Sequence, residues 1–240
     1  MFVVLVKLKC GLTNTVLSHL FGISESLVSR LITTWVNFLA NELRILFEMA
    51  AHDTSSAAEC FKDFDGLQII LDCTEVQIEK SNNLQARKEM WSEYKQRETV
   101  KFMIGLSPYL TVNYVSKAWG GRASDKKITL SSRNMLEKLE SGPSVMVDRG
   151  FDVGPDLAQQ GVQLIIPSFK GRGRTQISSQ ELSNYEMISR ARIHVERIIQ
   201  RVKTFHILDR TLTLSSKELI EPMFQTCAYL TNFQLPIVRN

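Results

Sequence analysis

The sequence is poor in residues that cross-link a chain or bind soft metals. Its four cysteines (Cys10, Cys60, Cys73 and Cys227) form no CxxC pair. This argues against a disulfide framework and against a thiolate zinc site, and it favours a reducing compartment. The four histidines include no closely spaced ligand pair, so a histidine-based metal site is also disfavoured.

The sequence also lacks a long apolar run. The opening MFVVLVKLKCGL is apolar, but it is much shorter than the roughly 20 residues that span a bilayer. It has no small-residue cleavage site, so we do not interpret it as a signal peptide. With 44% apolar and 22% charged residues, the chain has the composition of an ordinary globular protein. We expect a soluble, intracellular protein with no membrane contact.

Positive charge is concentrated in the second half of the chain. The net charge of +4 is modest, but residues 1–60 carry a balance of −1 and residues 161–210 a balance of +5. An uneven basic surface of this kind favours binding of a polyanion near the later segment. A solvated helix face with ordinary surface charge is the alternative.

The first fifty residues have helical periodicity, interrupted at Gly22-Ile23-Ser24. Gly22 can adopt a positive φ at a turn, and Ser24 is a good N-cap for the next helix. The spacing of Ser18, Gly22 and Val28 is that of a helix-turn-helix, in which Arg30 would be the basic residue of the recognition helix. A helical hairpin that only packs against the rest of the protein is equally consistent with this pattern.

The remaining chain predicts a linker over residues 51–66, followed by one mixed α/β domain over residues 67–235. The expected strands are Leu67–Ile78, Val100–Leu106, Thr111–Val115, Ser144–Asp148 and Val162–Pro167. The expected helices are Ser124–Leu139, Val153–Gln160, Ser179–Phe205 and Ser216–Phe233. The second and third strands form a predicted hairpin beside the first.

Three acidic residues stand out against this pattern. Asp72 and Asp148 each follow an apolar, β-branched run, and Glu196 lies on a long amphipathic helix. Ligands in open α/β sheets usually bind at the carboxyl ends of strands. We expect the helix to pack on the sheet with Glu196 toward the strand ends and its basic neighbours facing outward. Taken singly, such acids are more often structural, because an aspartate after a strand is common in turns and a glutamate flanked by arginines commonly forms a helix ion pair.

Several motifs in order give the acids more weight. They are LDCTEVQIEK, WSEYKQRETVKFMIGLSP, VSKAWGGRASDKKIT, SVMVDRGFD and ISRARIHVERIIQRVKTFHIL. Together they resemble the DDE superfamily endonuclease domain of PIF-Harbinger-like and insertion-sequence-type transposases, over roughly residues 67–232. The helical module over residues 1–50 resembles the helix-turn-helix that precedes this domain.

The resemblance implies an RNase H-like fold, a location in the nucleus (otherwise the cytoplasm) and two-metal chemistry on DNA. It implies that Asp72, Asp148 and Glu196 are catalytic and hold two Mg²⁺ or Mn²⁺ ions, with Asp72 bridging both. Asp125 matches a further family aspartate, which we expect to shape the site without ligating metal. Glu75, on the other side of an extended strand from Asp72, is not expected to be a ligand.

Basic residues near the third acid are candidates for contact with DNA phosphates. They are Lys170, Arg172, Arg174, Arg192, Arg197 and Arg201, and Arg30 is the corresponding candidate in the helix-turn-helix. Lys95 and Lys101 are further, weaker candidates. Surface solvation is the alternative explanation for each.

The leading hypothesis is a transposase-derived, metal-dependent endonuclease that hydrolyses phosphodiester bonds and transfers strands. A domesticated DNA-binding protein whose nuclease is silent is the runner-up, and a protein-interaction scaffold is a third. DNA is the expected partner. The sequence leaves open the target sequence, a homo-oligomer, a separate DNA-binding partner and further sequence before the first residue.

Overall fold

The computed structural model describes residues 1–49, 58–64, 66–139, 144–151, 153–159, 161–166 and 179–237. Within these residues no helix is both long enough and apolar enough to cross a membrane. The predicted basic loop at Lys170, Arg172 and Arg174 lies outside the described residues.

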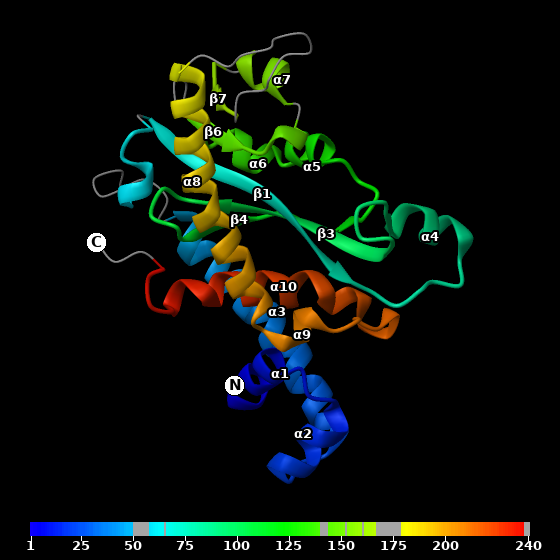
Figure 1. Cartoon of the computed structure of the whole chain (residues 1–240). Coiled ribbons are helices and arrows are strands. Elements are labelled where there is room, and N and C mark those ends of the chain that lie inside the picture. The colour runs from blue at the N-terminus through cyan, green and yellow to red at the C-terminus, as the bar shows by residue number, and fades with distance from the viewer. Residues whose placement is uncertain are drawn as a thin grey trace.

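A twisted mixed sheet forms the centre of the molecule (Figure 1). Its main path runs β2-β3-β1-β6-β7, and β4 and β5 both pair with β3. The β1–β3 pair is antiparallel, whereas β1 pairs with β6 and β6 with β7 in parallel. The strands are β1 (Leu67–Gln77), β2 (Trp91–Ser92), β3 (Arg97–Leu106), β4 (Val112–Val115), β5 (Trp119–Gly120), β6 (Ser144–Val147) and β7 (Gln163–Ile165). The predicted hairpin of β3 and β4 beside β1 is confirmed.

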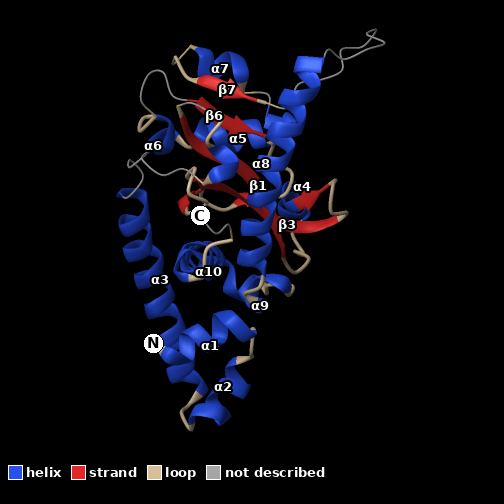
Figure 2. Cartoon of the chain, turned by 60° about the vertical axis from the view of Figure 1, so that its left-hand side comes forward, coloured by secondary structure: helices blue, strands red, loops and turns tan. Residues whose placement is uncertain are grey.

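Helices cover both faces of the sheet (Figure 2). The first face carries α3 (Glu25–Met49), α8 (Ser179–Lys203), α9 (His206–Asp209) and α10 (Lys217–Leu230). The second face carries α5 (Asp125–Ser131), α6 (Arg133–Leu136) and α7 (Gly154–Ala158). The remaining helices are α1 (Phe2–Cys10) and α2 (Asn14–Phe21) at the N-terminus and α4 (Leu84–Met90) before β2.

Alternation along the strands divides the core into two parts. In β1, Ile70 and Val76 pack into the cluster on the first face, whereas Ile69 and Leu71 pack into the cluster on the second. Successive strand residues point to opposite faces, so the apolar run of β1 supplies both clusters. Asp72 therefore shares the first face with Ile70, and this face is the one that α8 covers.

The helix-turn-helix is built as the sequence predicts. Gly22 ends α2 with φ 64°, and the Ser24 hydroxyl accepts a hydrogen bond from the Leu27 amide at 3.3 Å. Ser18 and Val28 are buried between the two helices. These local features fix the angle at which α3 leaves the turn.

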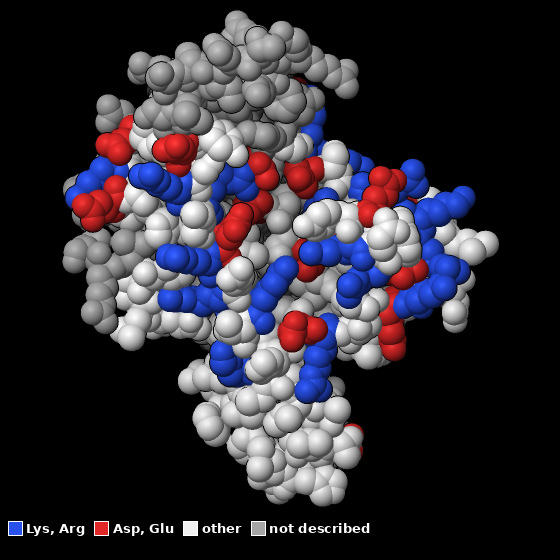
Figure 3. All heavy atoms as spheres, viewed as in Figure 1, with Lys and Arg blue, Asp and Glu red and all other residues white. Residues whose placement is uncertain are grey.

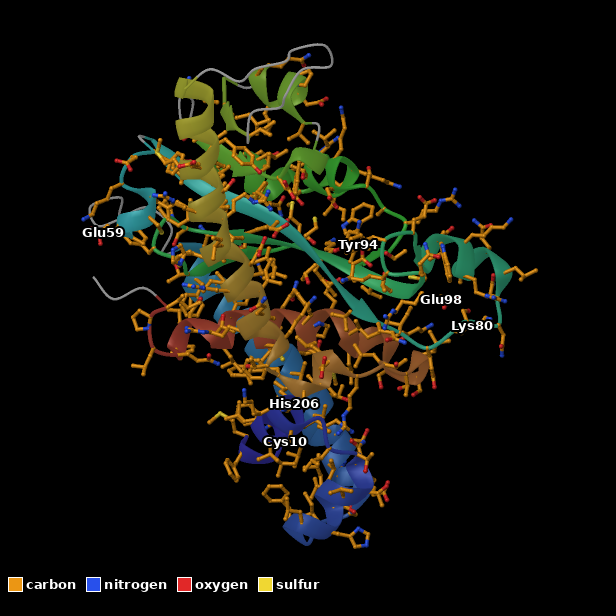
Figure 4. The ribbon with its side chains drawn as sticks, viewed as in Figure 1. Cys10, Glu59, Lys80, Tyr94, Glu98 and His206 are labelled. Atoms are coloured by element: carbon orange, nitrogen blue, oxygen red, sulfur yellow. The ribbon has the colours of Figure 1, made fainter. Side chains whose placement is uncertain are left out.

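The long helix α3 joins the N-terminal helices directly to the core of the sheet. Its C-terminal half packs along α10, where the Phe47 and Tyr229 rings stack with their centroids 5.9 Å apart. The Thr226 hydroxyl donates to the Val36 carbonyl at 3.3 Å. In the same way α1 packs on α9, at the junction marked by Cys10 and His206 in Figure 4. One continuous apolar cluster thus runs from Leu17 in α2 into the sheet.

Two segments differ from their sequence patterns. The single helix predicted over Ser124–Leu139 is wrong, because it breaks at Ser132 into α5 and α6. The Ser132 hydroxyl donates to the Ile128 carbonyl at 2.9 Å, and such side-chain bonds compete with regular helical bonding.

The second segment is residues 58–64, the longest part of the predicted linker that the structure describes. This segment packs against the rest of the domain. The Ala58 amide donates to the Pro108 carbonyl at 3.0 Å, and Phe61 is buried.

Candidate active site

Asp72 and Asp148 are neighbours on adjacent parallel strands. In the β1–β6 ladder, Leu71 pairs with Val147. Asp72 directly follows Leu71, and Asp148 directly follows Val147. Adjacent strands are roughly 5 Å apart, and residues in register point to the same face. Because β6 ends at Val147, this pair lies at the carboxyl end of one strand and within the other. We call Asp72 and Asp148 the aspartate pair.

The carboxyl group of Asp72 lies in a poorly hydrated position. Burial raises its pKa to about 6, and the nearby charges of Asp148 and Asp125 act in the same direction. The Arg192 guanidinium and the Cys73 amide oppose this rise, the amide by donating to Asp72 Oδ1 at 2.8 Å. Two carboxylates held close together in low dielectric create a strong demand for a cation.

Arg192 provides such a cation in this structure. It extends from α8 and places Nη1 against Oδ1 of Asp148. Its side chain is only 15% exposed, whereas that of Asp148 is 46% exposed. The sequence predicts an outward-facing, phosphate-contacting arginine here, but Arg192 points inward to the aspartate pair.

Glu196 lies one helical turn beyond Arg192, on the same flank of α8 and exposed to solvent. Gln200 and then Lys203 follow along this flank. Burial lowers the pKa of Lys203, with a contribution from Lys95, while the charges of Glu75, Asp72 and Asp209 raise it. Glu196 therefore stands on α8 between two residues that interact with the aspartate pair.

In this structure the three acidic side chains do not form a complete set of metal ligands. Among the described residues, no group of three or more His, Cys, Asp or Glu side chains is close enough to hold a metal ion. Convergence of Asp72, Asp148 and Glu196 on shared ions thus stays a prediction.

Asp125 approaches from the second face of the sheet. It stands at the start of α5, where Ser124 caps the helix by accepting from the Lys127 amide at 3.2 Å. A Cβ placed on Gly150 would lie 3.6 Å from Asp125 Oδ2, so Asp125 lies beside the turn that follows Asp148. This position agrees with the expectation that Asp125 shapes the site, a role that itself remains a prediction.

Lys101 anchors Asp125 and does not face outward toward DNA. Its Nζ lies 3.3 Å from Asp125 Oδ1 and 3.7 Å from Glu75 Oε1. It also donates to the Ala123 carbonyl at 3.0 Å. Glu75 accepts a further bond from the Thr99 hydroxyl at 2.8 Å. Glu75 is thus bound on the face opposite Asp72, as alternation along the strand predicts.

The other predicted DNA contacts differ in their settings. Arg197 is exposed on α8, whereas Arg201 donates from Nη1 to the Leu235 carbonyl at 2.6 Å. His194 is a partly buried residue of the same helix, and burial together with the Arg197 charge lowers its pKa.

Lys203 and Lys95 form a basic position near the aspartate pair that sequence patterns mark only weakly. Lys95 lies in the turn between β2 and β3, with Nζ 4.6 Å from the centre of the Tyr94 ring. Figure 4 labels Tyr94, which is 83% exposed. The helical spacing from Glu196 to Lys203 is the signal that points to Lys203, but the approach of Lys95 is visible only in three dimensions.

Figure 3 shows basic side chains over the lower part of α8 and over α4. The projecting N-terminal helices in the same view are mostly uncharged. Arg30 is exposed on α3, in the first two turns after the helix-turn-helix turn. Because phosphate contacts supply most non-specific affinity for DNA, the basic side chains over α8 and α4 are better placed for such contacts than the mostly uncharged N-terminal helices in this view.

The sheet order, with an antiparallel hairpin on one side of β1 and parallel strands on the other, defines an RNase H-like fold. Sequence comparison is consistent with this class. The family model for the DDE superfamily endonuclease matches residues 71–232, and the model for the helix-turn-helix of DDE superfamily endonuclease matches residues 1–45. No curated protein matches the chain.

The chain therefore belongs to the DDE superfamily endonucleases, with their helix-turn-helix in front of the endonuclease domain. The family resemblance stated from the sequence motifs is confirmed. Membership in this family, together with the helix-turn-helix, implies that the protein binds DNA.

Proposed function

We propose that this protein is a transposase-type, divalent-metal-dependent DNA endonuclease that hydrolyses phosphodiester bonds and transfers strands. The observation that carries the proposal is the aspartate pair, in register at the end of a parallel strand and beneath a helix that bears Glu196. Family membership gives the reaction class. The nucleus, where DNA is available, is the proposed place of action.

The donor set fits Mg²⁺ or Mn²⁺. Both ions prefer hard oxygen ligands, and the aspartate pair already holds the cationic guanidinium of Arg192. Asp72 and Asp148, with Glu196 turned inward, would hold the ions. When bound, two such ions stabilise the attacking and leaving oxygens of an in-line displacement.

The other side chains position the substrate and the acids. Lys203 and Lys95, of which Lys203 interacts with Asp72, and the exposed Arg197 of α8 would bind backbone phosphates without reading bases. Lys101 holds Asp125 beside the turn after Asp148. The Cys73 amide fixes one Asp72 oxygen.

Substitution of the three acids tests the proposal. Three variants, Asp72→Asn, Asp148→Asn and Glu196→Gln, should each lower the rate of Mg²⁺-dependent nicking of supercoiled DNA by more than roughly 100-fold. Loss of a residue that only hydrogen-bonds to a metal ligand already lowers activity or metal affinity by about 10–100-fold. Chelation of the metal should abolish nicking, and added Mg²⁺ should restore it. Glu186→Gln, an exposed change on the same helix, is the matched control and should keep the wild-type rate. Undiminished nicking in all three site variants would refute the proposal.

A silent DNA-binding protein is the second candidate. The observation in its favour is that Arg192 contacts Asp148 while Glu196 is exposed. This candidate predicts salt-sensitive DNA binding without cleavage in Mg²⁺ or Mn²⁺. A filter-binding assay and a nicking assay on one preparation separate the two candidates. A homo-oligomer or a separate DNA-binding partner is compatible with both.

A further inference from the structure

Arg192 is placed to act as more than a surface phosphate contact. It lies at the edge of the buried stripe of α8, next to Ala191 and one turn before Val195, which are both fully packed. Its guanidinium reaches Oδ1 of Asp148, and its charge also acts on Asp72. A single positive group thus serves both members of the aspartate pair.

The contact uses an oxygen that a divalent ion would need. Guanidinium stays protonated at all ordinary pH values, so Arg192 cannot release Asp148 by losing its charge. A guanidinium and a divalent ion repel each other strongly at a few ångströms in a poorly hydrated site. The two cations are therefore expected to exclude each other at Asp148.

The partner side chain is accessible enough for exchange. Asp148 is 46% exposed, so its carboxylate can be reached from solvent while Arg192 is still bound. DNA phosphate is a competing ligand for Arg192, since arginine binds phosphate through two parallel charge-assisted hydrogen bonds. The flank of α8 that carries Arg192 also carries Lys203, and Figure 3 shows basic side chains over the lower part of this helix.

We infer that Arg192 is an internal counter-ion that competes with divalent metal for Asp148, and that a DNA phosphate relieves the competition by taking the guanidinium. This inference rests on the proposed function, because it presumes that the aspartate pair holds metal. It makes metal loading depend on DNA: free protein binds metal weakly, and DNA-bound protein binds it well. By linkage, metal also strengthens DNA binding by the same factor.

The test is Mn²⁺ binding, followed at pH 8 by the electron paramagnetic resonance signal of free Mn²⁺. Without DNA, Arg192→Gln should bind Mn²⁺ at least about tenfold more tightly than wild type, a change of roughly 1.4 kcal/mol. Arg190→Gln is the matched control, since Arg190 lies half a turn away and pairs with Glu186 at the surface. This control should bind Mn²⁺ as wild type does. No gain in Arg192→Gln overturns the inference.

A second measurement adds a short duplex DNA, corrected for Mn²⁺ bound by the DNA alone. Wild type should gain Mn²⁺ affinity when DNA is present, and Arg192→Gln should gain at least about threefold less, because its competitor is already absent. Equal gains in both proteins overturn the role of the phosphate.

Two outcomes separate failure of this inference from failure of the proposed function. If wild type binds Mn²⁺, Asp148→Asn abolishes binding and Arg192→Gln binds no more tightly, the metal site stands and only the competition is refuted. If neither protein binds Mn²⁺ and Asp148→Asn changes nothing, the proposed site fails and the inference falls with it.

Arg192→Lys keeps the positive charge at this position and provides a second variant for the test. If Arg192→Gln does not fold, Arg192→Lys serves in its place. Lysine is a strongly hydrated point charge without the planar fork of arginine, so it should hold Asp148 less well and Mn²⁺ affinity should rise above the wild-type value. An unchanged affinity in a folded Arg192→Lys protein overturns the inference.

Discussion

At the residue scale, Asp72 is held in an environment that disfavours its charge. The apolar run that precedes it packs both faces of β1, and the carboxyl group is set between this core and α8. A group whose folded-state pKa lies near 6 is ionised at neutral pH only at a cost to stability. The ionised Asp72 carboxylate therefore lowers the stability of the metal-free protein, and a bound cation would compensate its charge.

Asp72→Asn should stabilise the metal-free protein above pH 6. The unfolded-state pKa is the ordinary value of 3.8 and the folded-state pKa is about 6. The loss of stability caused by the buried Asp72 charge is therefore absent below about pH 4, grows between these two pKa values and is complete above pH 6. Two pKa units correspond to roughly 3 kcal/mol, and Asn retains an oxygen for the Cys73 amide.

Urea unfolding in a chelator, at pH 8 and at pH 4, measures this effect. The variant should exceed wild type in free energy of unfolding at pH 8, by up to roughly 3 kcal/mol, and match it at pH 4. A variant that is less stable than wild type at pH 8 would contradict the conclusion that burial of the Asp72 charge destabilises the metal-free fold.

At the scale of elements, the sheet and α10 are joined by aromatic packing. The Phe102 ring of β3 and the Phe224 ring of α10 stack with their centroids 4.0 Å apart, and both are completely buried. This contact holds the first face together beneath α3 and α8. It lies on the same side of the sheet as the aspartate pair and belongs to the same apolar cluster as the buried residues of α8.

Phe224→Ala should destabilise the protein by about 3–5 kcal/mol, since it removes a fully buried ring and leaves a cavity. Phe38→Ala is the matched control, because Phe38 is 52% exposed on α3, and it should cost less than about 1 kcal/mol. Equilibrium denaturation compares the two. Equal losses in both variants would show that the stack does not carry the stability assigned to it.

At the scale of the whole molecule, the N-terminal helices and the central sheet share one core. Helix α3 spans 25 residues, a length of roughly 37 Å at 1.5 Å per residue. It begins in the helix-turn-helix turn and ends against α10 and β4. Any DNA bound at the start of α3 would therefore be held at a defined distance from the sheet.

A shared core predicts cooperative unfolding. Calorimetry of the metal-free chain should give one transition in which the helical module and the sheet melt together, because α1, α3, α9 and α10 lie in one apolar cluster. Two resolved transitions would show that the module over residues 1–50 folds independently of the sheet.

Much of the local structure is predictable from the sequence. The Gly22 turn, the Ser24 cap and the extent of β1 follow from glycine conformation, capping and apolar periodicity, which act over a few residues. The break at Ser132 is less predictable, because it depends on one side chain competing for a helical carbonyl.

By itself, the sequence determined the longer helices and strands, the family and the identity of the acids at strand ends, since periodicity and motifs are local. Only the tertiary structure decided that Asp72 and Asp148 are neighbours, that Lys101 binds Asp125, and that Arg192 turns inward to Asp148. These contacts join residues that are 24 to 76 positions apart along the chain. Sheet register and helix packing bring them together, and no local rule specifies either.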